Sequence, residues 1–516
     1  MLFNQTNTQP RFRDWLLEDP ENRRLGWLAA AVIVVQFLVF KFLYPFPNFM
    51  PPDSYSYLDS AFHNLSINMW AIGYSKFLRL FSSITSSHVA MVWFQYLLLE
   101  LSILYFLFSM KYLFSPGKWL FRCLLAFSTL NPLIPHISNF VGSDTLFTAL
   151  SLIWITQLCW IIYRPNTSLL FWHGLVVLAV FTVRYNALYY PVISIAVIIL
   201  SPLRVKTKLA EVGYILVLIG GFIVSTEYHY YKETKTVQFS AFGGWQLAAN
   251  ALYGYAYAKP DPPDKVPEKF RNLQAIVNHH MDSIRPLYNR PDREVAVYYL
   301  WDFKSPLRLY LNSIWGNDTV TPYFNRWASV APLYTDYGRY LILHHPEPFV
   351  RYYLWPNLIK YFVPPAGFMQ TYNMGSNRVD SIALLWFKWK SNVLTHYTRD
   401  NKIRVVAIFS VLLAIVNLIF PLNAAAFVVV GGFRHSNPTV KYILGMMSIV
   451  WLCNLVFSVF SAPIELRYQL FPMIITCVLD GLFLSYLVAE STLKKANPEI
   501  PSSKIDILIR ATTPIS

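Results

Sequence analysis

Residues 25–44 read LGWLAAAVIVVQFLVFKFLY, and residues 51–61, a short distance further on, read PPDSYSYLDSA. An apolar run of roughly 20 residues is long enough to cross a membrane as a helix. The second stretch begins just after that helix would leave the membrane, so an acid, hydroxyls and aromatic rings lie at the membrane surface. Together the two stretches predict a transmembrane helix followed by a polar loop.

The composition extends this interpretation to the whole chain of 516 residues. Hydrophobic residues make up 55% of the sequence and charged residues 14%, and the mean hydropathy is +0.36. Soluble domains carry roughly 25% charged residues, so the composition argues against a soluble multi-domain protein. The net charge of +15 comes from basic residues scattered in short loops, which is typical of membrane proteins and does not indicate a nucleic-acid partner.

Candidate membrane spans occur at residues 25–44, 88–110, 119–135, 143–163, 169–184, 187–203, 210–227, 402–420, 441–460 and 468–489. We therefore predict an all-α polytopic membrane protein with about ten transmembrane helices. The span at 402–420 could continue to residue 433. Alternatively, Pro421 and Asn423 could make it a hairpin and reverse the last two spans, although the basic loop FRHSNPTVK argues against this.

The spans divide the chain into a cytoplasmic N-terminal segment (1–24), an N-terminal transmembrane catalytic module (25–227) with an outer loop (45–87), an extracytoplasmic region (228–401), C-terminal transmembrane helices (402–490) and a cytoplasmic tail (491–516). The bias of Lys and Arg between loops sets this orientation. We expect the region 228–401, which is rich in Tyr, Trp and Pro, to have a mixed structure. A bacterial inner membrane, with the candidate site facing the periplasm, is the favoured location.

In this topology, ionisable side chains from four distant segments gather on the outer face: Asp53, Asp144, Arg184, Glu465 and Arg467. Ionisable groups in a membrane protein cost free energy, and they are functional candidates for that reason. Each also has a structural alternative. Asp53 and Asp144 could cap helix N-termini. Arg184 could reach lipid headgroups, and Arg467 could merely pair with Glu465.

Three of these segments resemble motifs of the GT-C membrane glycosyltransferases that use a polyprenyl-phosphate sugar as donor. The branch concerned, similar to glycosyltransferase family 39, contains the protein O-mannosyltransferases and the aminoarabinose transferase that modifies lipid A. PDSYSYLDSAF (52–62) resembles the first acidic motif, GSDTLFTALSL (142–152) the second, and PIELRYQLFPMI (463–474) the late Arg-Tyr motif. Asp53 is followed by Ser54, where the protein mannosyltransferases usually carry Asp-Glu. Asp144 also lacks a neighbouring acid, so no metal-binding residue is expected, although a divalent cation stays possible as a cofactor.

The resemblance implies an enzyme, a hexosyl- or pentosyltransferase that moves a sugar to an acceptor hydroxyl on the extracytoplasmic face with inversion. Such a transfer needs a carboxylate to take the acceptor proton, and we assign this role of general base to Asp53. Asp144 is the second catalytic candidate, an acid that orients the acceptor or the donor sugar.

The leaving phosphate needs positive charge, and the planar guanidinium group of Arg suits phosphate. We therefore expect Arg184 and Arg467 to hold the donor phosphate. Tyr57 lies one helical turn after Asp53 and would face the same way. Glu465 and Tyr468 complete the predicted substrate-binding set. The implied partners are a polyprenyl-phosphate-linked sugar, a protein, lipid or glycan acceptor, and membrane lipid.

Two other functions stay open. A transporter or flippase for a lipid-linked or anionic substrate would have ionisable groups near the middle of the bilayer, and only Glu100 and Asp480 lie deep within spans. A non-catalytic membrane assembly scaffold would use the region 228–401 to bind partners. A scaffold would not need acids and arginines from distant segments on one face, and for a transporter most of the charges lie at the outer rim and no internal repeat is evident in the sequence.

Overall fold

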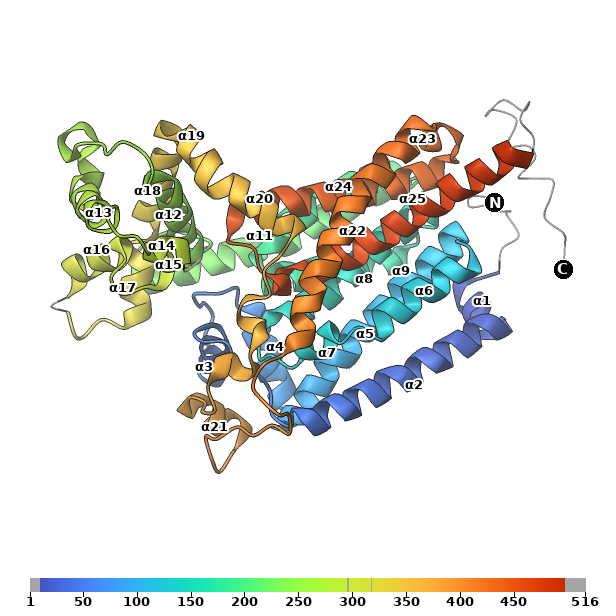
Figure 1. Ribbon diagram of the computed structural model, residues 1–516, viewed down its shortest axis with the longest axis horizontal. Helices are drawn as coiled ribbons and strands as arrows, with labels where there is room; N and C mark the ends of the chain where they lie inside the picture. The colour runs from blue at the N-terminus through green and yellow to red at the C-terminus, as the bar shows by residue number, and fades with distance from the viewer. Residues whose placement is uncertain (1–9, 295–296, 317, 497–516) are drawn as a thin grey trace.

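A bundle of apolar helices forms the larger part of the structure, a computed structural model that describes residues 10–294, 297–316 and 318–496 (Figure 1). Within that part of the chain, 8 helices are long and apolar enough to cross a membrane. They are α2 (Pro20–Leu43), α5 (His88–Phe114), the pair α6 (Lys118–Thr129) and α7 (Leu133–Ser138), α8 (Ser143–Tyr163), α11 (Val205–Thr234), α22 (Arg404–Val429), α24 (Pro438–Ser461) and α25 (Leu470–Ala496). The predicted all-α, multi-pass class is confirmed.

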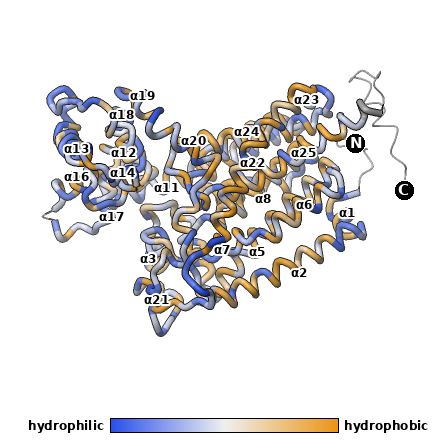
Figure 2. Tube along the Cα trace, in the orientation of Figure 1, coloured by the Kyte–Doolittle hydropathy of each residue, from blue (hydrophilic) through white to orange (hydrophobic). Residues whose placement is uncertain are grey.

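Two predicted spans are shorter helices, α9 (Thr167–Val183) and the pair η1 (Tyr185–Tyr189) and α10 (Tyr190–Leu200). The bundle helices are apolar on nearly all sides, as Figure 2 shows by colour. On α2, for example, Leu38 and Phe42 are 62% and 71% exposed. Helices that are apolar all round belong in a core or in a membrane, so these surfaces suit contact with lipid.

The segment after residue 403 forms one helix, α22, with Pro421 inside it. The hairpin that Pro421 and Asn423 could have made is therefore not formed. The Nδ2 group of Asn423 donates to an oxygen of Asp480 on α25 at 2.6 Å. This hydrogen bond joins polar side chains of two packed helices.

A second helical body, which we call the module, follows α11 and lies at the left of Figure 1. It contains α12 (Ala241–Tyr255), η2 (Pro263–Lys265), η3 (Glu268–Phe270), α13 (Arg271–Ile284), α14 (Pro291–Glu294), α15 (Tyr298–Trp301), α16 (Pro306–Trp315), α17 (Tyr323–Ser329), α18 (Ala331–His344) and α19 (Pro346–Phe349). Its own core centres on buried aromatic rings such as Trp245, Trp327 and Tyr334. The described residues of this region contain no strand, so the expectation of a mixed structure for 228–401 is wrong there.

Two glycines let α12 and α18 pack closely. A Cβ atom on Gly244 would lie 2.1 Å from the carbonyl oxygen of Ala331, and one on Gly338 would lie 2.8 Å from the backbone nitrogen of Ala248. Both contacts are to backbone atoms, which cannot move aside as a flexible side chain would. The short approach of these two helices therefore depends on the absence of side chains at both positions.

The chain returns from the module through η4 (Val350–Leu354) and α20 (Trp355–Phe362). There Tyr361 donates to Asn454 of α24 at 3.0 Å. Residues 363–403, with η5 (Gly367–Gln370), η6 (Tyr372–Gly375) and α21 (Ser381–Phe387), then pack against the first loop and join the bundle core. The predicted region 228–401 is thus two structures, the module and a return segment that belongs with the bundle. The predicted tail at 491–516 lies outside the described residues from 497 onward.

Candidate functional site

Asp53 is the first residue of α3 (Asp53–Phe62), which follows α2 in the first loop. The Ser54 hydroxyl donates to the carbonyl of Val141 at 2.6 Å and accepts the backbone N–H of Met50 at 2.8 Å. Since Val141 lies between α7 and α8, these bonds fix the start of α3 against the start of α8. The Asp53 carboxylate lies 3.2 Å from Nη1 of Arg467, so it faces a cation from the other end of the sequence.

Asp144 is the second residue of α8, where the helix dipole favours a negative charge. Its side chain is shared between two cations, an ion pair with Arg184 and a contact of 3.6 Å with Nη1 of Arg467. The adjacent Ser143 hydroxyl lies 3.1 Å from the Tyr57 hydroxyl and accepts from Arg184 at 3.3 Å. Asp144 is therefore part of a side-chain network as well as of a helix N-terminus.

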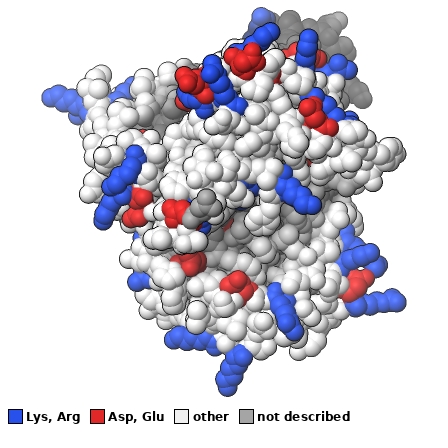
Figure 3. All heavy atoms as spheres, turned by 90° about the vertical axis from the view of Figure 1, so that its left-hand side faces the viewer, with Lys and Arg blue, Asp and Glu red and all other residues white. Residues whose placement is uncertain are grey.

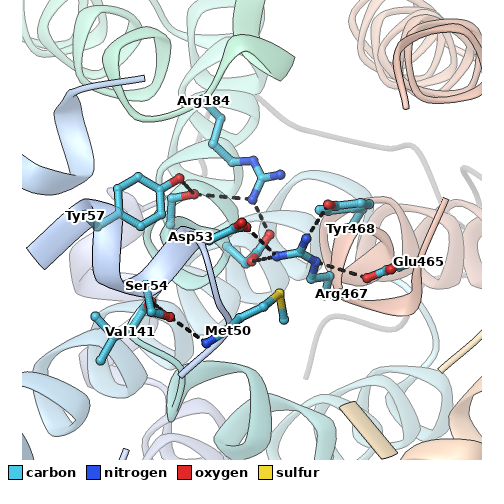
Figure 4. A network of polar contacts seen from close by, with 11 residues as sticks. Met50, Asp53, Ser54, Tyr57, Val141, Arg184, Glu465, Arg467 and Tyr468 are labelled. Atoms are coloured by element: carbon cyan, nitrogen blue, oxygen red, sulfur yellow. Dashed lines mark hydrogen bonds and ion pairs between the residues drawn. The ribbon is translucent and has the colours of Figure 1, made fainter. Parts of the chain in front are cut away.

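Arg467 is the centre of this network, as Figure 4 shows. It lies in η7 (Leu466–Gln469), the turn before α25. Besides the contacts of Nη1 with the two aspartates, its Nε donates to Glu465 at 3.2 Å and its Nη2 donates to the Tyr468 hydroxyl at 2.6 Å. Arg467 does pair with Glu465, as the structural alternative for this residue expected, but that pair is one of four contacts made by the guanidinium group.

Arg184 approaches from the turn between α9 and η1. Its guanidinium carbon lies 5.0 Å from the centre of the Tyr468 ring, and that of Arg467 lies 4.6 Å from the same ring. Cations within about 6 Å of an aromatic ring are attracted to its face. The Arg184 side chain is only 17% exposed, so it is held within the network and does not extend to the surface.

We call Asp53, Asp144, Arg184, Glu465 and Arg467 the charge cluster. It places three carboxyl groups against two guanidinium groups, and each acid is 13–21% exposed. Burial raises the pKa of the Asp53 carboxyl, and the Arg467 guanidinium opposes that rise. Burial likewise raises the pKa of Glu465, again opposed by Arg467. A carboxyl whose pKa lies above its usual range is better suited to accept a proton near neutral pH.

A cavity of about 450 Å³ adjoins the charge cluster. One wall contains Asp53, Arg184, Glu465, Arg467 and Tyr468. The first loop and the module supply further wall residues, Trp70, Phe242, Gln246, Asn250 and Trp301. Small-molecule sites have volumes of roughly 300–1,000 Å³ and combine apolar walls with a few polar groups. The cavity thus borders the charge cluster. Figure 3 shows the molecule from the side on which the module lies, where charged side chains are scattered over a largely uncharged surface.

The structure brings together all seven residues that the sequence singled out, the charge cluster with Tyr57 and Tyr468. Sequence reasoning missed Ser143, whose position beside Asp144 was the available signal. It also missed Trp70 and Trp301, which no motif distinguishes from the many other aromatic residues. Asp480 lies outside the cluster and is bonded to Asn423.

No group of three or more His, Cys, Asp or Glu side chains within residues 10–294, 297–316 and 318–496 is arranged to hold a metal ion. The three acids of the charge cluster are instead each directed at Arg467.

No family model, curated protein or solved structure matches this chain. The fold described above and the geometry of the charge cluster are therefore the basis on which its function is inferred.

Proposed function

We propose that this protein is an integral membrane glycosyltransferase that moves a sugar from a polyprenyl-phosphate donor to an acceptor hydroxyl. One observation carries the proposal. Three acids and two arginines from four distant segments meet at one end of the apolar bundle, beside a cavity of about 450 Å³. Burying so many charges is costly unless they are paired, and the reaction requires a base together with cations for phosphate.

Asp53 acts as the general base in this proposal. The acceptor oxygen attacks the anomeric carbon, its proton passes to the Asp53 carboxylate, and the bond between that carbon and the phosphate oxygen breaks. The raised pKa of Asp53 matches this role, because burial makes the carboxylate a stronger base. Attack from the side opposite to the phosphate inverts the anomeric centre.

Arg184 and Arg467 stabilise the departing polyprenyl phosphate, which gains negative charge as the bond breaks. A guanidinium group has five N–H donors, and the contacts of Arg467 within the cluster leave donors for a phosphate oxygen. The two cations are already held close together by Asp144 and the Tyr468 ring. Such preorganised charge acts without reorganisation during the reaction.

The membrane location suits a donor whose lipid tail stays in the bilayer while its sugar and phosphate reach the cluster. Lys111 lies in the last turn of α5, Lys118 and Arg122 lie at the start of α6, and Arg164 directly follows α8. All four are therefore away from the start of α8, which carries Asp144. Because cytoplasmic loops carry an excess of Lys and Arg, we propose that the cluster faces the extracytoplasmic side. A bacterial inner membrane and a protein, lipid or glycan acceptor belong to the same proposal.

The test is a transfer assay on membranes that contain the protein, with a radiolabelled polyprenyl-phosphate sugar and an acceptor extract. We expect Asp53→Asn to reduce transfer by about 10²-fold or more, the usual contribution of a general base. Asp59→Asn is the matched control, since Asp59 lies on the same helix and is 52% exposed. Full transfer by a folded Asp53→Asn protein would contradict the assignment of the base. Absence of transfer by the wild type from any lipid-linked sugar would contradict the function.

A further inference from the structure

Three aromatic side chains form a continuous wall of the cavity beside the charge cluster. Trp70 lies in the first loop, Phe242 in α12 and Trp301 at the end of α15. Their ring centres are 4.6 Å (Trp70–Phe242), 5.6 Å (Trp70–Trp301) and 6.4 Å (Phe242–Trp301) apart. We call these three residues the aromatic wall.

The aromatic wall differs from the aromatic core of the module in how far its rings are exposed. All three rings are only partly buried, whereas the aromatic rings of the module core, such as Trp245 and Trp327, are 0% exposed. The Nε1 group of Trp70 is buried and has no hydrogen-bond partner among the described residues. The wall therefore presents partly accessible apolar ring faces to the cavity.

From this geometry we infer that the aromatic wall is a saccharide-binding subsite, on which a sugar ring stacks while its reacting end points toward the charge cluster. The C–H groups on one face of a sugar ring carry slight positive charge and pack on the negative face of an aromatic ring. The ring of Tyr57 lies 6.5 Å from that of Trp70, and the wall lines the same cavity as the charge cluster. The inference rests on the proposed function for the identity of the ligand.

The polar groups beside the wall suit a sugar better than a lipid tail. Gln246 and Asn250 line the same cavity, and both amides are held in place. The Nε2 group of Gln246 donates to Asn250 at 2.7 Å, and Nδ2 of Asn250 donates to the carbonyls of Phe460 and Ser461 at 3.0 Å. Fixed amides can pair with sugar hydroxyls. A lipid tail, in contrast, needs an apolar surface continuous with the spanning helices, and the wall belongs to none of them.

Saturation-transfer NMR on the full-length protein in lipid nanodiscs tests the subsite without chemistry. The probes are the methyl pyranosides of mannose, glucose, galactose and N-acetylglucosamine, and methyl arabinofuranoside. We expect at least one probe to receive saturation at its ring C–H protons. Trp70→Leu should reduce that signal at least fivefold, and Trp70→Phe should keep more of it. Trp119→Leu, a change at a residue 77% exposed on α6, should leave the signal within twofold of wild type.

Saturation of none of the probes, or an unchanged signal in folded Trp70→Leu and Trp301→Leu proteins, would overturn the subsite. Trp301→Leu removes the second indole of the wall, so the subsite can still be tested when Trp70→Leu fails to fold. A polyprenyl-phosphate sugar added as competitor shows whether the wall binds the sugar of the donor or that of the acceptor. Displacement of the probe assigns the wall to the donor sugar, and retention assigns it to the acceptor.

The subsite and the proposed function can fail separately. A wild-type protein that binds glycosides but transfers no sugar would refute the transferase while supporting the subsite. Transfer by the wild type with unchanged KM values for donor and acceptor in Trp70→Leu would refute the subsite alone. Asp53→Asn should lose transfer but still bind the probe, because Asp53 is not part of the aromatic wall.

Discussion

Arg467 contacts three acids and one hydroxyl at once, so changing it tests the whole charge cluster. The variant Arg467→Lys keeps the positive charge but presents a single ammonium group. That group cannot span Asp53, Glu465 and Tyr468, which the three guanidinium nitrogens contact separately at 3.2, 3.2 and 2.6 Å. We expect the loss of two charge-assisted hydrogen bonds, each worth about 1.5–3 kcal/mol.

An ammonium group without these contacts is no longer positioned to bind the departing phosphate in a bidentate way, and the loss of two charge-assisted hydrogen bonds to that phosphate would cost the transition state about 3–6 kcal/mol. Since each 1.36 kcal/mol is tenfold in rate, kcat/KM should fall between about 10²- and 10⁴-fold. The assay is sugar transfer from a polyprenyl-phosphate donor by purified protein in nanodiscs. The control is Arg404→Lys, because Arg404 pairs with Asp400 but is 79% exposed. A loss in Arg467→Lys no larger than in the control would refute the reasoning.

The pH profile gives a second, independent measurement on the same residue. Arg467 opposes the effect of burial on Asp53 and so holds the pKa of that carboxyl down. A general base is active when deprotonated, so transfer should rise with pH through the pKa of Asp53. Arg467→Gln removes the cation, and the rising part of the profile should move to higher pH. A profile that stays in place, or moves to lower pH, would show that Asp53 is not the titrating base.

Three further results are expected. Tyr468→Phe keeps the aromatic ring but removes the hydroxyl that accepts a hydrogen bond from Arg467 at 2.6 Å. The value of kcat/KM should fall about tenfold, as for one lost hydrogen bond to a charged group. An unchanged kcat/KM would argue against a role for this hydroxyl. Gly244→Ala should lower the melting temperature, because its Cβ would meet a backbone oxygen at 2.1 Å. The control is Gly213→Ala on α11, where a Cβ would have nothing within 4 Å, and it should leave the melting temperature unchanged or raise it. Calorimetry measures both melting temperatures, and an equal effect of the two changes would contradict the close packing of α12 and α18. Asn423→Ala removes the hydrogen-bond donor to Asp480 and should destabilise the protein by about 1–3 kcal/mol, whereas the double change Asn423→Ala with Asp480→Leu should recover most of this stability.

The bundle could be predicted from the sequence because membrane helices carry a strong local signal. A run of about 20 apolar residues identifies a span regardless of what it packs against. The continuity of α22 through Pro421 could not be predicted, because a proline can end, kink or remain within a helix according to its neighbours. Here the neighbour is α25, which packs along α22 and carries Asp480, the partner of Asn423.

The residues of the charge cluster could be predicted because topology places the ends of successive spans on alternating faces. Acids and arginines at the same face can meet even when the sequence between them is long. The aromatic wall could not be predicted, since Trp70 and Trp301 come together only through the packing of the module on the first loop. The sequence indicates helical pieces within 277–303 but not a module that is helical throughout its described residues, because abundant Tyr, Trp and Pro give no regular period to recognise.

The distance along the chain between Asp53 and Arg467 determines when in synthesis the site can exist. Asn373 of the return segment 363–403 accepts the backbone N–H of Phe49 at 3.0 Å, just before Asp53, and Arg467 is 414 residues from Asp53 along the chain. A nascent chain therefore carries Asp53 long before it carries Arg467, the cation that pairs with it, whereas Asp144 is followed after only 40 residues by its partner Arg184. The site is completed only when the last helices enter the membrane, so every truncation before residue 467 leaves the base without its cation.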